Sequence, residues 1–178
     1  MSLPGTFVEL ARSIHDRESF TCGEPELDDF LKKQALRHMQ AGISRTMVLP
    51  AAKPMPDGKY PICAFYTIAP GSISRKTLPD RLAKKLPGYP VPVFLLAQLA
   101  VHEGNKGEGL GKVALIKALE HLYDINAHMR AYAVIVDCLN ENIAAFYEQF
   151  GFELLSKQDG RDRLFLPMKT VKLLFEEG

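Results

Sequence analysis

The sequence predicts an α/β (α+β) fold in which a mixed central sheet of about six to seven strands is flanked by about four helices. Two observations predict this class. Segments with the apolar pattern of strands alternate with segments of helical spacing, and pairs of strands are expected near both ends of the chain. The length of 178 residues is typical of one domain, and no linker is visible, so residues 1–178 are predicted to form a single domain.

The composition is that of a globular protein that stays in the cytoplasm. Hydrophobic residues make up 47% of the chain, and the formal net charge is +1. No apolar run approaches the ~20 residues of a membrane span, and no export signal is visible. The three cysteines, Cys22, Cys63 and Cys138, are too scattered to predict disulfides or a metal site, and the five histidines have no ligand spacing. We therefore expect reduced thiols and no metal.

The first half of the chain is expected to contain four strands and one long helix. A strand is expected over residues 7–14, and a helix starts at Pro25, where a missing N–H costs nothing. Gly42 is suited to end that helix. The remaining elements expected here are a strand over 46–49, a loop over 50–61, a strand over 62–68 that Pro70-Gly71 ends, a short basic helix over 79–86, and a buried strand over 93–101.

The second half alternates helices and strands. A helix is expected from Leu110 to about Asn126, with leucines at positions 115, 119 and 122 on its core face. A buried strand over 131–138 follows. The next helix is capped by Asn140 or Asn142 and closed by Gly151. The last strand pair is expected over 152–155 and 163–168, around a polar turn over 156–162.

Glycines 107, 109 and 111 lie between the buried strand 93–101 and the following helix. Glycines let backbone N–H groups approach an anion closely, and a helix N-terminus adds positive electrostatic potential. The segment therefore suggests a pyrophosphate site, although an ordinary strand-to-helix turn could carry the same glycines. A Walker loop is excluded because Gly109 precedes Leu110, and the G-x-G-x-G spacing departs from the dinucleotide fingerprint.

A second segment, Asn140–Phe152, decides between these interpretations. Together with Lys106–Gly111 it resembles the GNAT acetyltransferases, in which the first segment binds the pyrophosphate of coenzyme A. The resemblance implies a GNAT fold, acetyl-CoA as the donor, and a cleft that opens between the strands starting near Val93 and Ala131. Lys106 stands where the family has Gln or Arg, so planar contacts are lost while a positive charge is kept.

Further segments are similar to the GNAT toxins of bacterial toxin–antitoxin pairs, and the similarity covers roughly residues 6–170. These toxins acetylate the amino group of aminoacyl-tRNA. They often have Arg and Asp where this chain has Gln98 and His102. The segments that carry the similarity are Phe20–Leu31, Ser44–Thr46, Phe65–Thr67, Gly71–Ile73 and Tyr89–Val93.

The resemblance implies a role for Tyr147 as the acid that protonates the leaving thiolate; periodicity alone is equally typical of a core residue. A phenol of pKa ~10 can donate to a thiolate whose conjugate acid has a pKa of ~8.5. The backbone N–H near Val101 is expected to stabilise the oxyanion. The coenzyme-binding residues implied by the resemblance are Leu99, Ala100, Val101, Lys106, Gly107, Glu108, Gly109, Leu110, Gly111, Lys112, Asn140, Ala144 and Phe146.

The acceptor is expected to be an α-amine, since no carboxylate lies within residues 93–101 to act as a base. An α-amine with a pKa of ~7.7–8.0 is partly neutral at pH 7, whereas a lysine amine with a pKa of ~10.4 is almost fully charged. His102 or Glu103 could relay a proton through water, but both are also typical turn residues. Basic residues expected at a tRNA surface, or else at a solvated face, are Lys33, Arg37, Arg45, Lys84 and Lys85.

Three functions stay open at this stage. The favoured one is a toxin that acetylates aminoacyl-tRNA, whose family implies a ribbon-helix-helix antitoxin and often a homodimer. The first alternative is an N-acetyltransferase of a small amine or peptide. The second is a non-catalytic acyl-CoA-binding regulatory module, which an intact Tyr147 disfavours.

Overall fold

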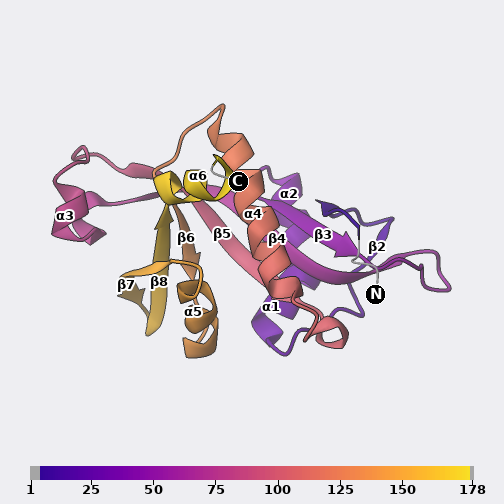
Figure 1. The fold of residues 1–178 in the computed structure, drawn as a ribbon. Helices are drawn as coiled ribbons and strands as arrows, with labels where there is room; N and C mark the ends of the chain where they lie inside the picture. Colours follow the sequence, from indigo (N-terminus) through magenta and orange to yellow (C-terminus); the bar gives the residue numbers. More distant parts are fainter. Residues whose placement is uncertain (1–4, 177–178) are drawn as a thin grey trace. The chain divides into compact units, whose positions relative to one another are not determined.

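The computed structural model describes residues 5–176, and its chain divides into two compact units. The first unit comprises the chain up to Ala69 together with Gln98–Ala118, and the second comprises Pro70–Ala97 together with the chain from Leu119 on. Two strands and one helix run from one unit into the other: β4 (Tyr60–Ile73), β5 (Val91–Val101) and α4 (Leu110–Asn126). Most helices and strands of both units are labelled in Figure 1.

The first unit is built on β3 (Arg45–Pro50), which pairs with β1 (Val8–Glu9) on one side and with β4 on the other, both antiparallel. A further short strand, β2 (His15–Asp16), pairs with the start of β4. Helical residues follow from Pro25 as α1 (Pro25–Asp29), a π-helical segment over Phe30–Gln34, and α2 (Ala35–Gln40). The helix start at Pro25 is confirmed, and Gly42 follows its end with a φ of 78°.

The core of the first unit is aromatic. Phe20 and Phe65 are almost fully buried, with ring centroids 5.3 Å apart in an edge-on arrangement. Phe30 stacks on Phe65 from the helical side at 6.5 Å. On the sheet, the buried hydroxyls of Thr46 and Thr67 hydrogen-bond to each other at 2.7 Å, so neither is left unpaired in the interior. This core fixes the helix from Pro25 against β4.

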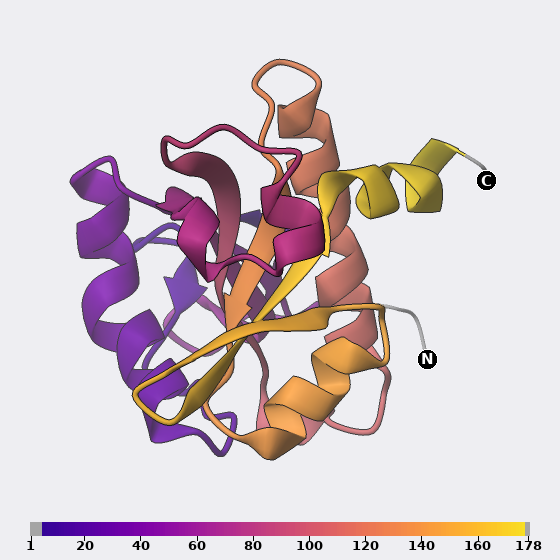
Figure 2. The ribbon, with the colours of Figure 1, turned by 90° about the vertical axis from the view of Figure 1, so that its left-hand side faces the viewer.

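The second unit joins parallel and antiparallel strands. β5 pairs with β6 (Ala133–Asp137) in parallel, and β6 pairs antiparallel with β8 (Arg161–Pro167), which pairs antiparallel with β7 (Glu153–Gln158). Helix α5 (Glu141–Glu148) packs against β8, as both views show (Figures 1 and 2). The unit also contains a 3-10 turn over Arg75–Thr77, α3 (Asp80–Ala83) and α6 (Met168–Glu176).

Several predicted elements are confirmed. The mixed α/β class is correct, and helix α4 has the predicted bounds, with Leu115, Leu119 and Leu122 buried. Asn140, one of the two candidate caps, caps α5 by accepting from the N–H of Ile143 at 3.0 Å. Within residues 5–176, no helix is long and apolar enough to cross a membrane.

The expected strand over residues 7–14 is wrong. The strand stops after Glu9, because the chain turns over Arg12–Ile14. The Nδ1 atom of His15 closes that turn by accepting from the N–H of Ala11 at 3.0 Å. Here a side-chain acceptor, rather than a neighbouring strand, takes the backbone N–H, and the strand ends early.

Pro70-Gly71 does not end a strand as predicted, since β4 continues to Ile73. A Cβ at Gly71 would lie 2.9 Å from Cγ of Leu95, so the glycine allows the close approach of β5 instead of marking a turn.

The predicted polar turn over 156–162 is wrong, because β7 and β8 meet across the two-residue turn Asp159-Gly160 (Figure 2). Both residues have positive φ, 52° and 77°, as the commonest two-residue hairpin turn requires. Helix α6 was not expected at all. Its apolar positions Met168, Val171 and Phe175 have helical spacing, which is the signal that was available.

Candidate active site

The glycine-rich turn in the first unit connects β5 to α4 through a 3-10 turn over Glu103–Asn105. Gly107 and Gly109 have φ values of 85° and 77°, a region that other residues rarely adopt. A Cβ built at either position would meet no atom within 4 Å. The backbone of the turn is therefore open on the side where those side chains would stand, and a phosphate could approach it there.

The ammonium group of Lys106 already has a protein partner. Its Nζ atom donates to the carbonyl oxygen of Cys22 at 2.6 Å. An ammonium group has three donors and keeps its positive charge in such a bond, so the contact of Lys106 with the coenzyme stays a prediction.

At the end of β5, successive backbone N–H groups point to opposite edges of the strand. The N–H of His102 donates to the carbonyl of Cys63 on β4 at 2.8 Å. Because successive N–H groups of a strand point to opposite edges, the N–H of Val101 is directed away from β4. This orientation suits the predicted oxyanion role of that group. Leu99 and Val101 are half-buried and Ala100 is buried, which keeps this stretch of backbone ordered.

Within the second unit, the pairing of β5 with β6 is short. It covers Phe94 with Val134 and Leu95 with Ile135, although β5 continues beyond Leu95 and β6 continues to Asp137. The pairing thus ends inside both strands.

Tyr147 lies in a closely packed aromatic cluster in the second unit. Its ring makes edge-on contacts with Phe146 and Phe152 at centroid distances of 5.2 and 5.3 Å, and the residue is only 5% exposed. Burial raises the pKa of the phenol well above 10, and the nearby Cys138 thiol raises it further. Tyr147 is therefore a neutral phenol at physiological pH, and its hydroxyl carries a proton.

The other predicted coenzyme residues of the second unit lie on α5. Asn140 caps the helix, Ala144 is buried, and Phe146 is half-buried between the rings of Tyr147 and Phe150. The backbone of this helix start is thereby fixed. The structure holds Asn140, Ala144 and Phe146 in one helix with Tyr147, while the remaining predicted coenzyme residues belong to the first unit.

The predicted tRNA-binding residues fall into two groups. Lys33, Arg37 and Arg45 are exposed in the first unit, and Lys84 and Lys85 are exposed in the second. Lys33 pairs with Asp29 at 3.5 Å. The other four cations of this set form no ion pair with any residue that the structure describes. Two arginines near Lys84 and Lys85 have partners within the protein. Arg75 donates to the carbonyl of Leu86, and Arg81 pairs with Glu153.

Sequence reasoning missed Tyr89 as a candidate for substrate contact. The structure describes all sixteen phenylalanine and tyrosine residues, and among them only Tyr89 has a largely exposed ring, at 68%. It follows Lys84 and Lys85 closely, and the proline after it restricts its backbone. The sequence signal from which Tyr89 could have been found is a Tyr-Pro dipeptide next to a basic segment.

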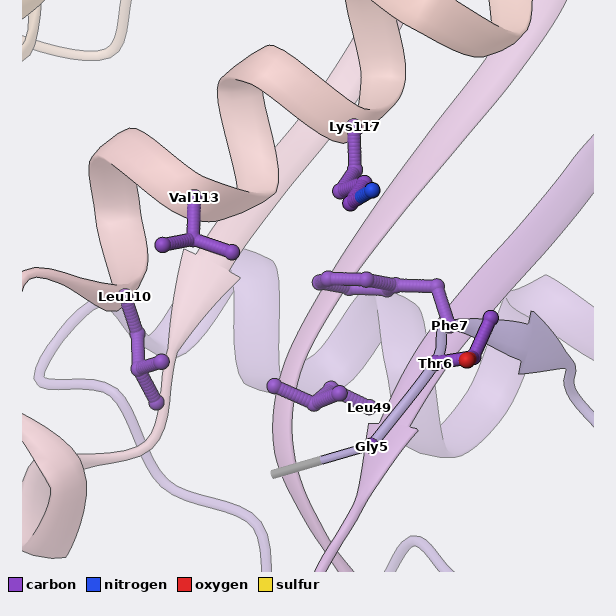
Figure 3. Close-up of a pocket in the computed structure, with 7 residues that line it drawn as sticks. All are labelled: Gly5, Thr6, Phe7, Leu49, Leu110, Val113 and Lys117. Carbon is purple, nitrogen blue, oxygen red and sulfur yellow. The ribbon is translucent and has the colours of Figure 1, made fainter. Parts of the chain in front are cut away.

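A cavity of about 360 Å³ lies in the first unit beside the start of α4. In Figure 3 the ring of Phe7 lies between the side chains of Leu49 and Lys117. Leu110 is the one lining residue that was predicted as a coenzyme residue, so this mainly apolar cavity does not coincide with the predicted site. No group of His, Cys, Asp and Glu side chains suited to hold a metal ion occurs in residues 5–176.

Residues 76–152 match the model of the acetyltransferase (GNAT) family. The chain is also 37% identical, over 89% of its length and 90% of the relative's, to a tRNA-acetylating toxin of Mycobacterium tuberculosis. The chain therefore belongs to the GNAT acetyltransferase family and is an enzyme of that class.

Two solved structures share the fold over nearly the whole chain. AtaT complexed with acetyl-methionyl-tRNAfMet has a TM-score of 0.82 at 27% identity, over 96% of this chain and 98% of its own. AtaTR bound with AcCoA has a TM-score of 0.81 at 27% identity, over 96% and 97%. The GNAT toxins are thus the branch of the family that this chain resembles in sequence and in structure.

Proposed function

We propose that this chain transfers the acetyl group of acetyl-CoA to the α-amino group of aminoacyl-tRNA and so acts as a toxin on translation. The observation that carries the proposal is the 37% identity, over most of both chains, to a tRNA-acetylating toxin. The solved AtaT complexes, one with an acetylated tRNA and one with AcCoA, support the same pair of substrates.

The residues divide the reaction among three tasks. The amine nitrogen attacks the thioester carbonyl, a C–N bond forms, and the carbonyl oxygen becomes an oxyanion that the N–H near Val101 would stabilise. The C–S bond then breaks. Tyr147 would give its proton to the departing thiolate, and the proton lost by the attacking amine passes to water or to a neighbouring base. The backbone from Lys106 to Lys112 would hold the pyrophosphate.

The exposed cations suit an RNA substrate. Arg45 begins β3 in the first unit, and Lys84 and Lys85 end the basic segment of the second. Such side chains bind phosphates with an affinity that falls steeply with salt, because each contact releases counterions.

The direct test uses labelled acetyl-CoA with charged total tRNA over a range of salt concentrations. We expect acetylated aminoacyl-tRNA, with activity that falls steeply as salt rises. The triple variant Arg45→Glu, Lys84→Glu, Lys85→Glu should lose activity on charged tRNA and keep its binding of acetyl-CoA. Product from small amines alone, with little salt dependence and an unaffected triple variant, would contradict the tRNA substrate and leave the acetyltransferase class in place.

The partners and the compartment are part of the proposal. A toxin of this kind would be neutralised by an antitoxin, for which we propose the ribbon-helix-helix type, and the toxin would form a homodimer in the cytoplasm. The three cysteines are free and buried, which is consistent with a reducing compartment. A ribbon-helix-helix gene beside this one, and a dimeric mass by light scattering, are the observations to seek.

A further inference from the structure

The segment Thr21–Gly23 crosses the start of the glycine-rich turn and bonds to it at three positions. The N–H of Thr21 donates to Nδ1 of His102 at 3.2 Å, and the N–H of Glu103 donates to the carbonyl of Thr21 at 2.8 Å. The third bond runs from Nζ of Lys106 to the carbonyl of Cys22 at 2.6 Å. We call Thr21–Gly23 the strap.

The other side of the strap is held by one carboxylate. Asp28, in α1, accepts from the N–H of Cys22 at 2.9 Å through one oxygen and from the hydroxyl of Thr21 at 3.4 Å through the other. Its neighbours Phe30 and Leu31 are buried in the core of the first unit. Asp28 therefore transmits the position of a packed helix to the strap.

The strap and the turn fit closely at Gly23. Gly23 has a φ of 89°, and a Cβ there would lie 3.3 Å from a carboxylate oxygen of Glu103 and 3.5 Å from Nζ of Lys106. The thiol of Cys22 is buried, and its Sγ atom lies 3.7 Å from the carbonyl of Glu24. Burial, and after it the hydrogen bond with the Asp28 carboxylate, raises the pKa of this thiol to about 12.

His102 fits the same arrangement. It is one of the two positions at which the chain departs from the toxin-like pattern, which has Asp there. Its Nδ1 atom accepts the backbone N–H of Thr21, and its ring lies against Phe20 at 5.7 Å. The imidazole thus supplies the acceptor that fixes the N–H of Thr21.

The turn needs such external support. Gly107 and Gly109 adopt positive φ with no atom within 4 Å of a built Cβ, so nothing packs on the side of the turn where those side chains would stand. Glycine loses more conformational entropy on ordering than any other residue, and a flexible turn would lose that entropy when it binds a ligand. Fixing the turn beforehand removes this cost from binding.

We propose that the strap preorganises the coenzyme-binding turn, with the carboxylate of Asp28 and the ammonium group of Lys106 as positioning groups that set the affinity for acetyl-CoA by holding the backbone of the turn in place. The inference rests on the proposed role of the turn in coenzyme binding. It assigns a function to the Phe20–Leu31 segment, which was recognised from its similarity to the toxins but has no catalytic task.

The experiment measures acetyl-CoA binding by calorimetry, together with the KM for acetyl-CoA and kcat at saturation. Asp28→Ala should raise Kd and KM by about 10-fold while kcat stays within about two-fold, since one charged hydrogen-bond acceptor is lost. Asp28→Asn, whose amide oxygen can still accept from the N–H of Cys22, should recover most of the affinity. The matched control is Asp29→Ala, which removes an exposed carboxylate next in the chain whose partner is Lys33.

A second variant guards against a folding defect in Asp28→Ala. Lys106→Met keeps the aliphatic stem and removes the bond to Cys22, and it should also raise Kd. Hydrogen exchange of residues 103–112 without ligand should be faster in both variants than in wild type. Unchanged exchange and unchanged Kd, or a fall in kcat with KM unchanged, would overturn the inference. Absence of binding by wild type would instead overturn the proposed function, while the exchange data would still decide whether the strap holds the turn.

Discussion

The glycine-rich turn of the first unit and the Tyr147 cluster of the second differ in what they expose. The turn presents backbone, with glycines at positive φ and open space beside them. Tyr147 is buried among aromatic rings, and burial raises the pKa of its phenol. In the proposed function, the turn would bind through backbone groups, which every residue has, so binding would depend on its conformation. The Tyr147 cluster would act through a single hydroxyl, which a substitution by phenylalanine removes while keeping the ring.

The sharpest test of this contrast is Tyr147→Phe, which removes one oxygen atom and keeps the ring contacts. We expect turnover to fall by about 10²–10⁴-fold, the range for a positioned proton donor, because the thiolate would leave unprotonated. Acetyl-CoA binding by calorimetry and the melting temperature should stay near their wild-type values. A variant with full turnover would reduce Tyr147 to a packing residue.

In the turn, conformation and charge can be separated at Gly109. Gly109→Glu places a carboxylate beside the proposed pyrophosphate and should weaken acetyl-CoA binding by about 100-fold or more. Gly109→Ala keeps the site neutral but must adopt a φ of 77°, at a cost of about 1–2 kcal/mol for a residue other than glycine. Thermal shift with acetyl-CoA ranks the two. Equal binding by the glutamate variant and wild type would remove the phosphate from this turn.

The substrate side of the comparison is tested at Tyr89, whose exposed ring follows the basic segment. Stacking of a base on an aromatic ring contributes about 1–3 kcal/mol, so Tyr89→Ala should raise the KM for charged tRNA by about 5- to 100-fold. Tyr89→Phe keeps the π-face and should behave like wild type. Unchanged KM values in steady-state assays of both variants would contradict a contact between this ring and tRNA, and would favour another partner for it, such as an antitoxin.

The smallest expected effect is a pH dependence of stability from His15. The residue is 3% exposed, and burial lowers the pKa of its imidazole in the folded state. The unfolded chain, with a pKa near ~6.5, then binds more protons than the folded chain over the intervening pH range. The contribution of His15 is therefore present in full above about pH 6.5 and is lost as pH falls through the lower folded value.

The measurement is the free energy of unfolding in urea at several pH values between about 5 and 8. His15→Asn is the matched variant, because its amide oxygen can replace Nδ1 as the acceptor for Ala11 and does not titrate. The variant should lose less stability on acidification than wild type. Parallel curves for the two proteins would contradict a titrating role of His15.

Several features of this protein followed from local sequence. The apolar spacing of helix α4 and the proline at position 25 predict helix bounds, because hydrophobic periodicity and missing donors act within one or two turns. The glycine spacing after β5 and the segment Asn140–Phe152 indicated the family. Tyr147 was singled out by this resemblance, since periodicity alone is equally typical of a core residue.

Other features were decided by tertiary structure. Gly71 marks a close approach of β5 rather than a turn, which depends on Leu95, a residue distant in sequence. The ammonium group of Lys106 donates to the carbonyl of Cys22, 84 positions away along the chain, a contact that no local pattern indicates. The acceptor role of His102 likewise depends on Thr21. Hydrogen bonds between distant segments leave no periodic signal in a single sequence. The strap, and its contacts with the turn, could therefore be identified only from the folded structure.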